Sequence, residues 1–323
     1  MSLSKQKSSS FILGLLVFVL SFVGLVSTQA IFRQYAIAGV YFHGIPSESM
    51  MQAISISDLR DEPIRSLWNI HIQPPLFDFL RMLLAQLSHH NDPLQLQYSV
   101  DGGLYIVWAL VYALTCCLIY IWLSKITSIW FALAATFVFS VSPPMLLYAT
   151  ILETTFLSSF LILCFLYLLW KIKGGENVSP YVLGLSFLLL FFTRSIFQWQ
   201  WIILIIPCLF LLKYPAQSIK RFLLITCIIV FAYLIKQYML FGITSTSSFA
   251  GLNLCQSIQA CKAHEINPDG VGLNSMLPSA LTREKKLTGA HNFNSLIDLK
   301  LNKAYMNDYR EKLLLISKTD LFN

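Results

Sequence analysis

The chain has 323 residues, of which 56% are hydrophobic and only 12% are charged, and its mean hydropathy is +0.64. A soluble globular domain carries about 25% charged residues, so this composition excludes an ordinary soluble domain and predicts an all-α integral membrane protein. The formal net charge is +7, but the Lys and Arg residues stand at the ends of apolar runs and form no basic stripe. No nucleic-acid partner is therefore expected.

The first apolar run extends from Phe11 to Ile31 and follows a serine-rich start that contains Lys5 and Lys7. Such a start is typical of a signal peptide or of a retained membrane anchor. We interpret the run as a retained anchor, because the apolar stretch is long and "STQAIF" is only a fair cleavage site.

Further apolar runs follow along the chain, and with the first they predict about seven transmembrane helices, since a hydrocarbon core of ~30 Å needs about 20 helical residues. They are Leu104–Leu123, Ile129–Tyr148, Phe156–Trp170, Tyr181–Phe192, Trp199–Leu212 and Phe222–Phe241. The two runs that flank "TRSIFQWQ" are short for full crossings, and they are interpreted either as one helical hairpin or as shorter helices that meet around a polar site. Residues 1–241 are thus predicted to form a membrane domain, and residues 242–323 a polar tail with a helix near 296–317.

The orientation follows from the rule that cytoplasmic loops carry an excess of Lys and Arg. With the N-terminus cytoplasmic, every predicted inner loop carries basic residues, namely Lys125, Lys171, Lys173, Lys213, Lys220 and Arg221. The loop 33–103 and the tail 242–323 are then predicted to lie on the outer face, which is periplasmic, extracellular or lumenal to the endoplasmic reticulum.

Five of the seven cysteines lie inside apolar runs, where they are expected to be small buried hydrophobic residues. Cys255 and Cys261 lie in the polar tail, close enough along the chain to form a disulfide if that tail faces an oxidising compartment.

The outer loop contains the stretch "HIQPPLFDFLRMLLAQL", which predicts a turn fixed by Pro74 and Pro75 and then an amphipathic helix. Its apolar stripe consists of Leu76, Phe79, Leu80, Leu83, Leu84 and Leu87. Such a helix is expected to lie along the membrane interface with its apolar face toward lipid. A simpler alternative is a surface helix that begins at the prolines, with His71 incidental.

Ionisable residues of both signs are predicted to share the outer face. Candidate catalytic residues are the carboxylates Glu48, Asp61 and Glu62 together with His71. Candidate substrate-binding residues are Glu153, Arg194, Gln198 and Lys236. A carboxylate base, a His donor and a cation that binds phosphate suit chemistry on a phosphate-bearing lipid. An alternative is that some of these acids only cap short helices or lie in solvent. The loop contains no Asp-X-Asp motif, which favours a site without a metal but leaves a divalent ion open as an alternative, and no other cofactor is expected.

These residues resemble the type C (GT-C) membrane glycosyltransferases, which include protein O-mannosyltransferases and aminoarabinose transferases. The family has a first outer loop with an acidic residue and a His/Lys-Pro-Pro-Leu motif, and the counterpart here is His71-Ile72-Gln73-Pro74-Pro75-Leu76, with two residues inserted after the His. The acidic pair resembles Asp61-Glu62, whereas the family's usual spacing points to Glu48, so Glu48 and Asp61 are alternative bases.

The resemblance implies a glycosyltransferase that moves a sugar from a polyprenyl or dolichyl phosphate to an acceptor, which is a protein, a lipid or a glycan. It also implies substrate-binding roles for Gln73, Tyr148 and Glu153, and a phosphate-binding role for Arg194. Two alternatives remain open: a non-catalytic relative of such enzymes, and a transporter of polyprenyl lipid or solute.

Overall fold

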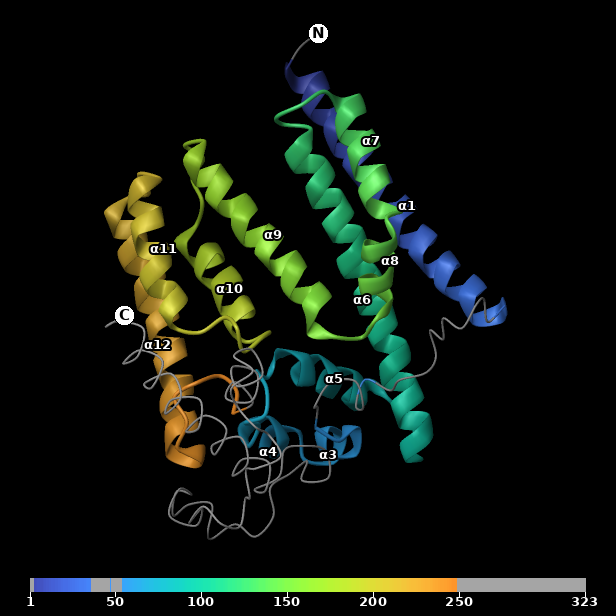
Figure 1. Ribbon diagram of the computed structural model, residues 1–323, viewed down its shortest axis with the longest axis vertical. Coiled ribbons are helices and arrows are strands. Elements are labelled where there is room, and N and C mark those ends of the chain that lie inside the picture. Colours follow the sequence, from blue (N-terminus) through green and yellow to red (C-terminus); the bar gives the residue numbers. More distant parts are fainter. Residues whose placement is uncertain (1–2, 36–46, 48–53, 249–323) are drawn as a thin grey trace, which may run out of the picture. The chain divides into compact units, whose positions relative to one another are not determined.

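The computed structural model describes residues 3–35, 47 and 54–248, and within these ranges all regular structure is helical (Figure 1). The expected tail helix near 296–317, the Cys255–Cys261 pair and Glu48 lie outside the described residues. The chain divides into two compact units. The first unit comprises residues 1–50 and 87–178, and the second comprises residues 51–86 and 179–323.

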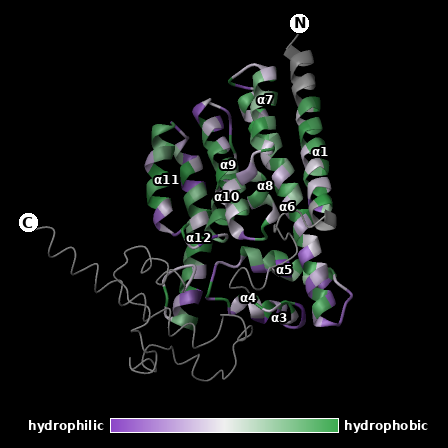
Figure 2. Ribbon diagram, turned by 45° about the vertical axis from the view of Figure 1, so that its right-hand side comes forward, coloured by the Kyte–Doolittle hydropathy of each residue, from purple (hydrophilic) through white to green (hydrophobic). Residues whose placement is uncertain are grey.

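The first unit consists of long apolar helices. Helix α1 (Leu3–Tyr35) packs along α6 (Pro93–Leu123), which also contacts α7 (Ile129–Ser140), α8 (Pro143–Thr150) and α9 (Thr154–Lys173). At Gly14 an added Cβ would meet the Cys117 and Tyr120 side chains at 3.8 Å, so α1 lies close against α6 at this point. The predicted helices at 11–31, 104–123 and 156–170 are confirmed, and much of their ribbon has the hydrophobic colour in Figure 2.

Helix α6 begins eleven residues before the predicted Leu104, because its start is set by a cap and not by the apolar run. Pro93 occupies the first turn, where its missing N–H is not needed. The Asp92 side chain accepts a hydrogen bond from the Gln95 amide at 3.0 Å. The expected loop 33–103 therefore ends in three turns of helix.

The expected single span Ile129–Tyr148 is broken. Helices α7 and α8 meet at an angle of 58°, at Val141-Ser142 before the proline pair Pro143-Pro144. Proline cannot donate to the helix ladder and disfavours helical geometry in the residue before it, so a new helix starts at Pro143.

The second unit contains three short helices from the predicted outer loop and three helices from the later apolar runs. The short ones are α3 (Ile56–Asp61), α4 (Pro63–Trp68) and α5 (Leu76–Leu87), and the others are α10 (Pro180–Phe191), α11 (Gln200–Leu211) and α12 (Ala216–Phe241). Helix α10 packs against α12 at Gly184, where an added Cβ would meet Thr226 Cγ2 at the ordinary contact distance of 3.5 Å. Helix α12 ends at Gly242, which adopts the left-handed conformation that glycine tolerates best.

Fewer helices than the seven expected spans have the length needed to cross a membrane. Among the described residues, four helices are long and apolar enough to cross a membrane, or five if the bent pair α7–α8 forms one span. Helices α10 and α11 have 12 residues each, which corresponds to about 18 Å, short of a ~30 Å core. The chain is thus an α-helical multi-pass membrane protein by the length and composition of its helices.

Candidate functional site

The Pro-Pro-Leu turn is tied to the end of α10. The Leu76 amide donates a hydrogen bond to the Phe192 carbonyl at 2.9 Å, and the Phe79 amide donates to the Pro75 carbonyl at 2.8 Å as α5 begins. The predicted amphipathic helix is confirmed as α5, and its stripe points outward, with Leu83 43% and Leu87 74% exposed. An apolar helix face that is exposed in this way is typical of a helix that lies at a membrane interface.

The opposite face of α5 carries a buried ion pair. Asp78 and Arg81 are both fully buried, and Arg81 Nη1 lies 2.6 Å from Asp78 Oδ1. The same guanidinium nitrogen donates to the Ile54 carbonyl at 2.7 Å, and Gln73 Nε2 donates to Asp78 Oδ2 at 3.2 Å. Gln73 is therefore engaged in holding the turn to α5.

The loop that precedes the turn is bound to the end of α12 and to the segment after it. Gln237 Nε2 donates to the Ile70 carbonyl at 3.3 Å, and the Ser248 amide donates to the His71 carbonyl at 2.7 Å. The Ser247 hydroxyl donates to the Ile72 carbonyl. Residues about 170 positions apart in the chain thus form one layer.

His71 lies in the centre of this layer. Its side chain is fully buried, its ring lies 5.1 Å from that of Phe241, and its Nδ1 lies 3.0 Å from the Ser248 hydroxyl. A fully buried imidazole of this kind joins the loop to the segment that follows α12. His71 does not line the cavity described next.

An apolar cavity of about 660 Å³ lies in the second unit. Its lining comes from α4, from the Pro-Pro-Leu turn and from α12, and consists of Ile64, Leu67, Trp68, Pro75, Leu76, Phe79, Phe192, Ile229, Ala232, Tyr233 and Lys236. Its volume falls in the range of ~300–1,000 Å³ typical of small-molecule sites.

Lys236 is the one charged residue among these lining side chains. Its Nζ lies 4.9 Å from the Tyr233 ring centre, 5.5 Å from that of Phe241 and 5.8 Å from that of Trp68. Its hydrogen bond to the Ile70 carbonyl is long, at 3.5 Å. It forms no ion pair with a carboxylate of the described residues. Aromatic faces attract such a cation but do not neutralise it.

The candidate acids of this unit do not line the cavity. Asp61 is 60% exposed and pairs with Arg60 at 2.9 Å, and Glu62 is 51% exposed and pairs with Arg65 at 3.3 Å. This stretch forms two short helices, which are broken where Pro63 follows Glu62. Glu62 is the N-cap residue of α4, but its side chain makes no cap hydrogen bond.

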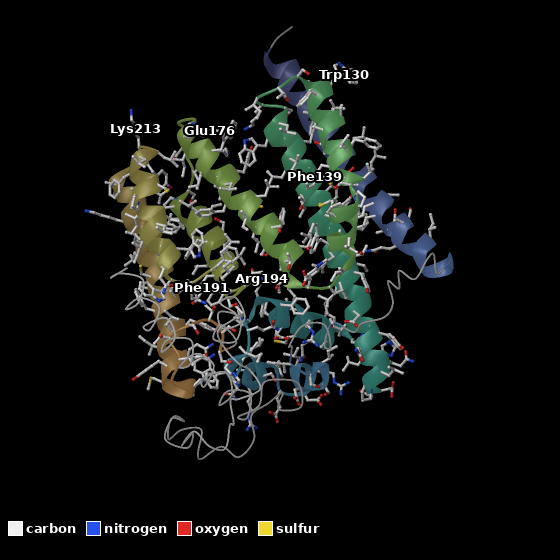
Figure 3. All side chains as sticks on the ribbon, viewed as in Figure 1. Trp130, Phe139, Glu176, Phe191, Arg194 and Lys213 are labelled. Atoms are coloured by element: carbon white, nitrogen blue, oxygen red, sulfur yellow. The ribbon has the colours of Figure 1, made fainter. Side chains whose placement is uncertain are left out.

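Arg194 and Gln198 lie in the connection between α10 and α11, where Arg194 is labelled in Figure 3. Gln198 Nε2 donates to the Thr246 hydroxyl at 3.1 Å, so it joins this connection to the segment after α12. Arg194 is partly buried. Neither residue lines the cavity.

Tyr148 and Glu153 belong to the first unit. Tyr148, on α8, is 44% exposed. Glu153 is the residue that precedes α9, with extended backbone angles. A carboxylate at this position is favoured by the partial positive charge of a helix N-terminus, which explains it without a substrate.

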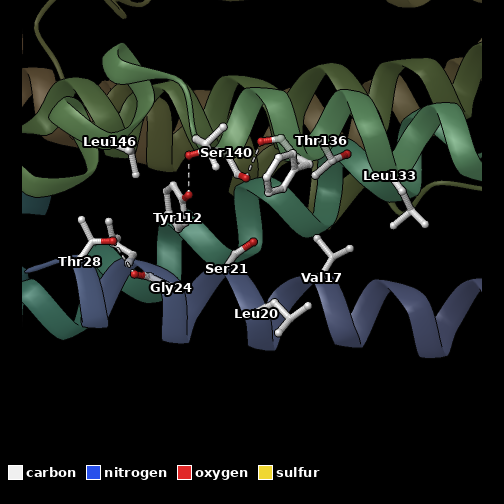
Figure 4. Close-up of a pocket in the computed structure, with 13 residues that line it drawn as sticks. Val17, Leu20, Ser21, Gly24, Thr28, Tyr112, Leu133, Thr136, Ser140 and Leu146 are labelled. Atoms are coloured by element: carbon white, nitrogen blue, oxygen red, sulfur yellow. Dashed lines mark hydrogen bonds between the residues drawn. The ribbon is translucent and has the colours of Figure 1, made fainter.

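The first unit has a cavity of its own, of about 440 Å³, between α1, α6, α7 and α8 (Figure 4). Tyr112 donates from its hydroxyl to the Ser140 carbonyl at 2.7 Å beside this cavity. Thr136 also lines it, and its buried hydroxyl has no hydrogen-bond partner among the described residues.

The contact of Lys236 with the three aromatic rings described above was not predicted from the sequence. Ile229, Ala232, Tyr233 and Lys236 recur at spacings of three and four and so share one face of α12, a signal that the sequence does contain. Within the described ranges no group of three or more His, Cys, Asp or Glu side chains is placed to hold a metal ion. No protein-family model, curated protein or solved structure matched the chain.

Proposed function

We propose that this membrane protein is a glycosyltransferase that takes a sugar from a polyprenyl-phosphate carrier and passes it to an acceptor at the membrane surface. One observation carries the proposal: the Pro-Pro-Leu turn and Lys236 line the same apolar cavity. An isoprenoid phosphate has an apolar chain that fits apolar walls and an anionic head that fits a lone cation.

Lys236 supports this assignment because it forms no ion pair within the part of the chain that the structure describes. A partly desolvated ammonium without a counter-charge is unfavourable, and a phosphate oxygen would supply a charge-assisted hydrogen bond. The rings of Trp68 and Tyr233 would then pack against the first isoprene units. The sugar would lie outside the cavity, where the acceptor has access to it.

In the chemical step, the acceptor oxygen or nitrogen attacks the anomeric carbon, and the bond from that carbon to the phosphate oxygen breaks. The polyprenyl phosphate leaves with the electron pair beside Lys236, and a carboxylate takes the proton of the acceptor. Glu48 and Asp61 are the alternative bases, and the variants Glu48→Gln and Asp61→Asn distinguish them through the transfer rate.

The experiment measures binding of farnesyl phosphate and of farnesol to the full chain in detergent. The wild type is expected to prefer the phosphate at least tenfold, Lys236→Gln to lose this preference, and Lys236→Arg to retain part of it. Lys220→Gln, an exposed lysine on the same helix, is the control and should bind like the wild type. Equal binding of both ligands by the wild type would refute the site.

A non-catalytic lipid-binding protein is the second candidate, because no carboxylate of the described residues lines the cavity. Sugar transfer from the native lipid pool in membranes separates the two functions. Binding that depends on Lys236 without any transfer would retain the cavity and reject the enzyme.

A further inference from the structure

A second cluster of charged and aromatic side chains lies in the first unit, where α6 and α9 end. Trp122 on α6 contacts Tyr167 and Trp170 on α9, with ring centres 5.8 and 6.1 Å apart. Tyr167 and Trp170 stack on each other at 5.8 Å with an interplanar angle of 17°. All three rings are partly exposed, so they present an aromatic surface at one end of two adjacent helices.

Two lysines lie over these rings and share one carboxylate. Lys125 Nζ lies 5.3 Å from the Trp170 ring centre, and Lys171 Nζ lies 6.0 Å from that of Tyr167. Glu176 forms ion pairs with both lysines: its carboxylate oxygens lie 2.9 Å from Lys171 Nζ and 3.6 Å from Lys125 Nζ. The hydrogen bond from Lys171 lowers the pKa of Glu176. One carboxylate cannot neutralise two ammonium groups, so the cluster keeps a net positive charge.

The position of this cluster relates it to the membrane. Both α6 and α9 are candidate membrane spans, and the cluster lies where they end. Figure 3 shows Trp130, at the start of α7 and 81% exposed, at the same end of the unit as Glu176. Tryptophan, tyrosine and lysine concentrate at the level of lipid head groups, so this end of the unit is expected to lie at that level.

We propose that Trp122, Lys125, Tyr167, Trp170, Lys171 and Glu176 form a binding site for the head group of an anionic phospholipid. Lys125 and Lys171 donate to the phosphate, and the rings pack against the glycerol region. Glu176 competes with the phosphate for both ammonium groups. The aromatic surface favours a lipid over a soluble anion, because only a lipid brings apolar surface together with its charge. The site is independent of the proposed transferase function.

The experiment uses the full chain in phosphatidylcholine nanodiscs that contain a fixed fraction of lipid with brominated acyl chains, either phosphatidylglycerol or phosphatidylcholine. Brominated chains quench nearby tryptophans, so enrichment of the anionic lipid appears as excess quenching. The wild type is expected to show this excess. Each lysine near an anionic surface is worth about fivefold in affinity, so Lys125→Gln with Lys171→Gln should reduce the enrichment about 25-fold, to the level of phosphatidylcholine.

Glu176→Gln supplies a test of opposite sign, because it removes the internal competitor and should increase the enrichment several-fold. Lys220→Gln changes a lysine of the second unit that takes no part in these contacts, so it is the matched control and should leave the enrichment unchanged. Replacing both Trp122 and Trp170 by Phe should abolish the excess signal.

Three results would overturn the proposal. They are equal quenching by the two brominated lipids in the wild type, an excess that survives loss of both lysines, and an excess that survives loss of both tryptophans. Displacement of the brominated phosphatidylglycerol by millimolar inorganic phosphate would mark the cluster as a site for the free ion and would also reject it.

Discussion

Removing Asp78 is expected to destabilise the second unit more than any change on its surface. Asp78 and Arg81 are fully buried and 2.6 Å apart, so Asp78→Ala leaves a guanidinium in the interior without its counter-ion. Breaking a buried pair from one side costs about 3–5 kcal/mol. Asp78→Asn keeps the volume but not the charge, and it is expected to fall in the same range.

The double variant Asp78→Leu with Arg81→Met separates charge from packing. Replacing both partners of a buried pair by apolar side chains is commonly neutral or stabilising, so this variant should recover the wild-type free energy of unfolding. The assay is reversible unfolding in mixed detergent micelles. A loss below about 1 kcal/mol for Asp78→Ala would refute the reasoning, since the pair would then be hydrated. A double variant as unstable as the single one would show that the pair itself is needed.

Two further predictions concern the first unit. Thr136→Val should raise the free energy of unfolding by about 1 kcal/mol, because a buried hydroxyl that has no partner among the described residues is costly. Thr115→Val should not raise it, because the Thr115 hydroxyl donates to the Val111 carbonyl. Thermal unfolding in detergent compares the two variants. The pKa of Glu176 is lowered by its hydrogen bond from Lys171, so the folded state binds this proton less tightly than the unfolded chain does. The contribution of the pair to the free energy of unfolding is therefore present above the unfolded pKa and is lost as the pH falls through the folded pKa. The stability difference between wild type and Glu176→Gln should therefore shrink as the pH is lowered from 7 to 3, and a constant difference would contradict this.

The helices were predictable from the sequence wherever apolar length alone decides. The runs that became α1, α9 and α12 are long, continuous and free of breaks, and all three are confirmed. The predictions were wrong where a cap or a break decides. Asp92 and Pro93 start α6 before its apolar run, and Pro143 interrupts a run that otherwise appears continuous.

The amphipathic helix after Pro75 was predictable from its apolar stripe, but the role of the opposite face was not. Asp78 and Arg81 lie three residues apart, a spacing at which side chains meet on a helix. On a soluble protein such a pair would lie at the surface. Here the apolar stripe points outward and the pair is buried, which is the arrangement expected where lipid, not water, solvates the outer face.

The lining of the Lys236 cavity could not be predicted for a related reason. In a soluble helix the apolar face marks the protein interior, because water solvates the other face. In a membrane span both the lipid and the protein interior are apolar, so hydrophobicity does not say which face of α12 is inside. An ionisable residue is the exception, since it is costly in lipid and turns toward protein or water. Lys236 therefore marks the face of α12 that lines the cavity, and the residues three, four and seven positions before it, Tyr233, Ala232 and Ile229, line the cavity with it. The fully buried residues of the helix, such as Val230, lie on an adjacent face. The same rule applies to any span whose apolar stretch carries one charge: the charge selects the face that lines the polar site, and the helical period then gives the lining.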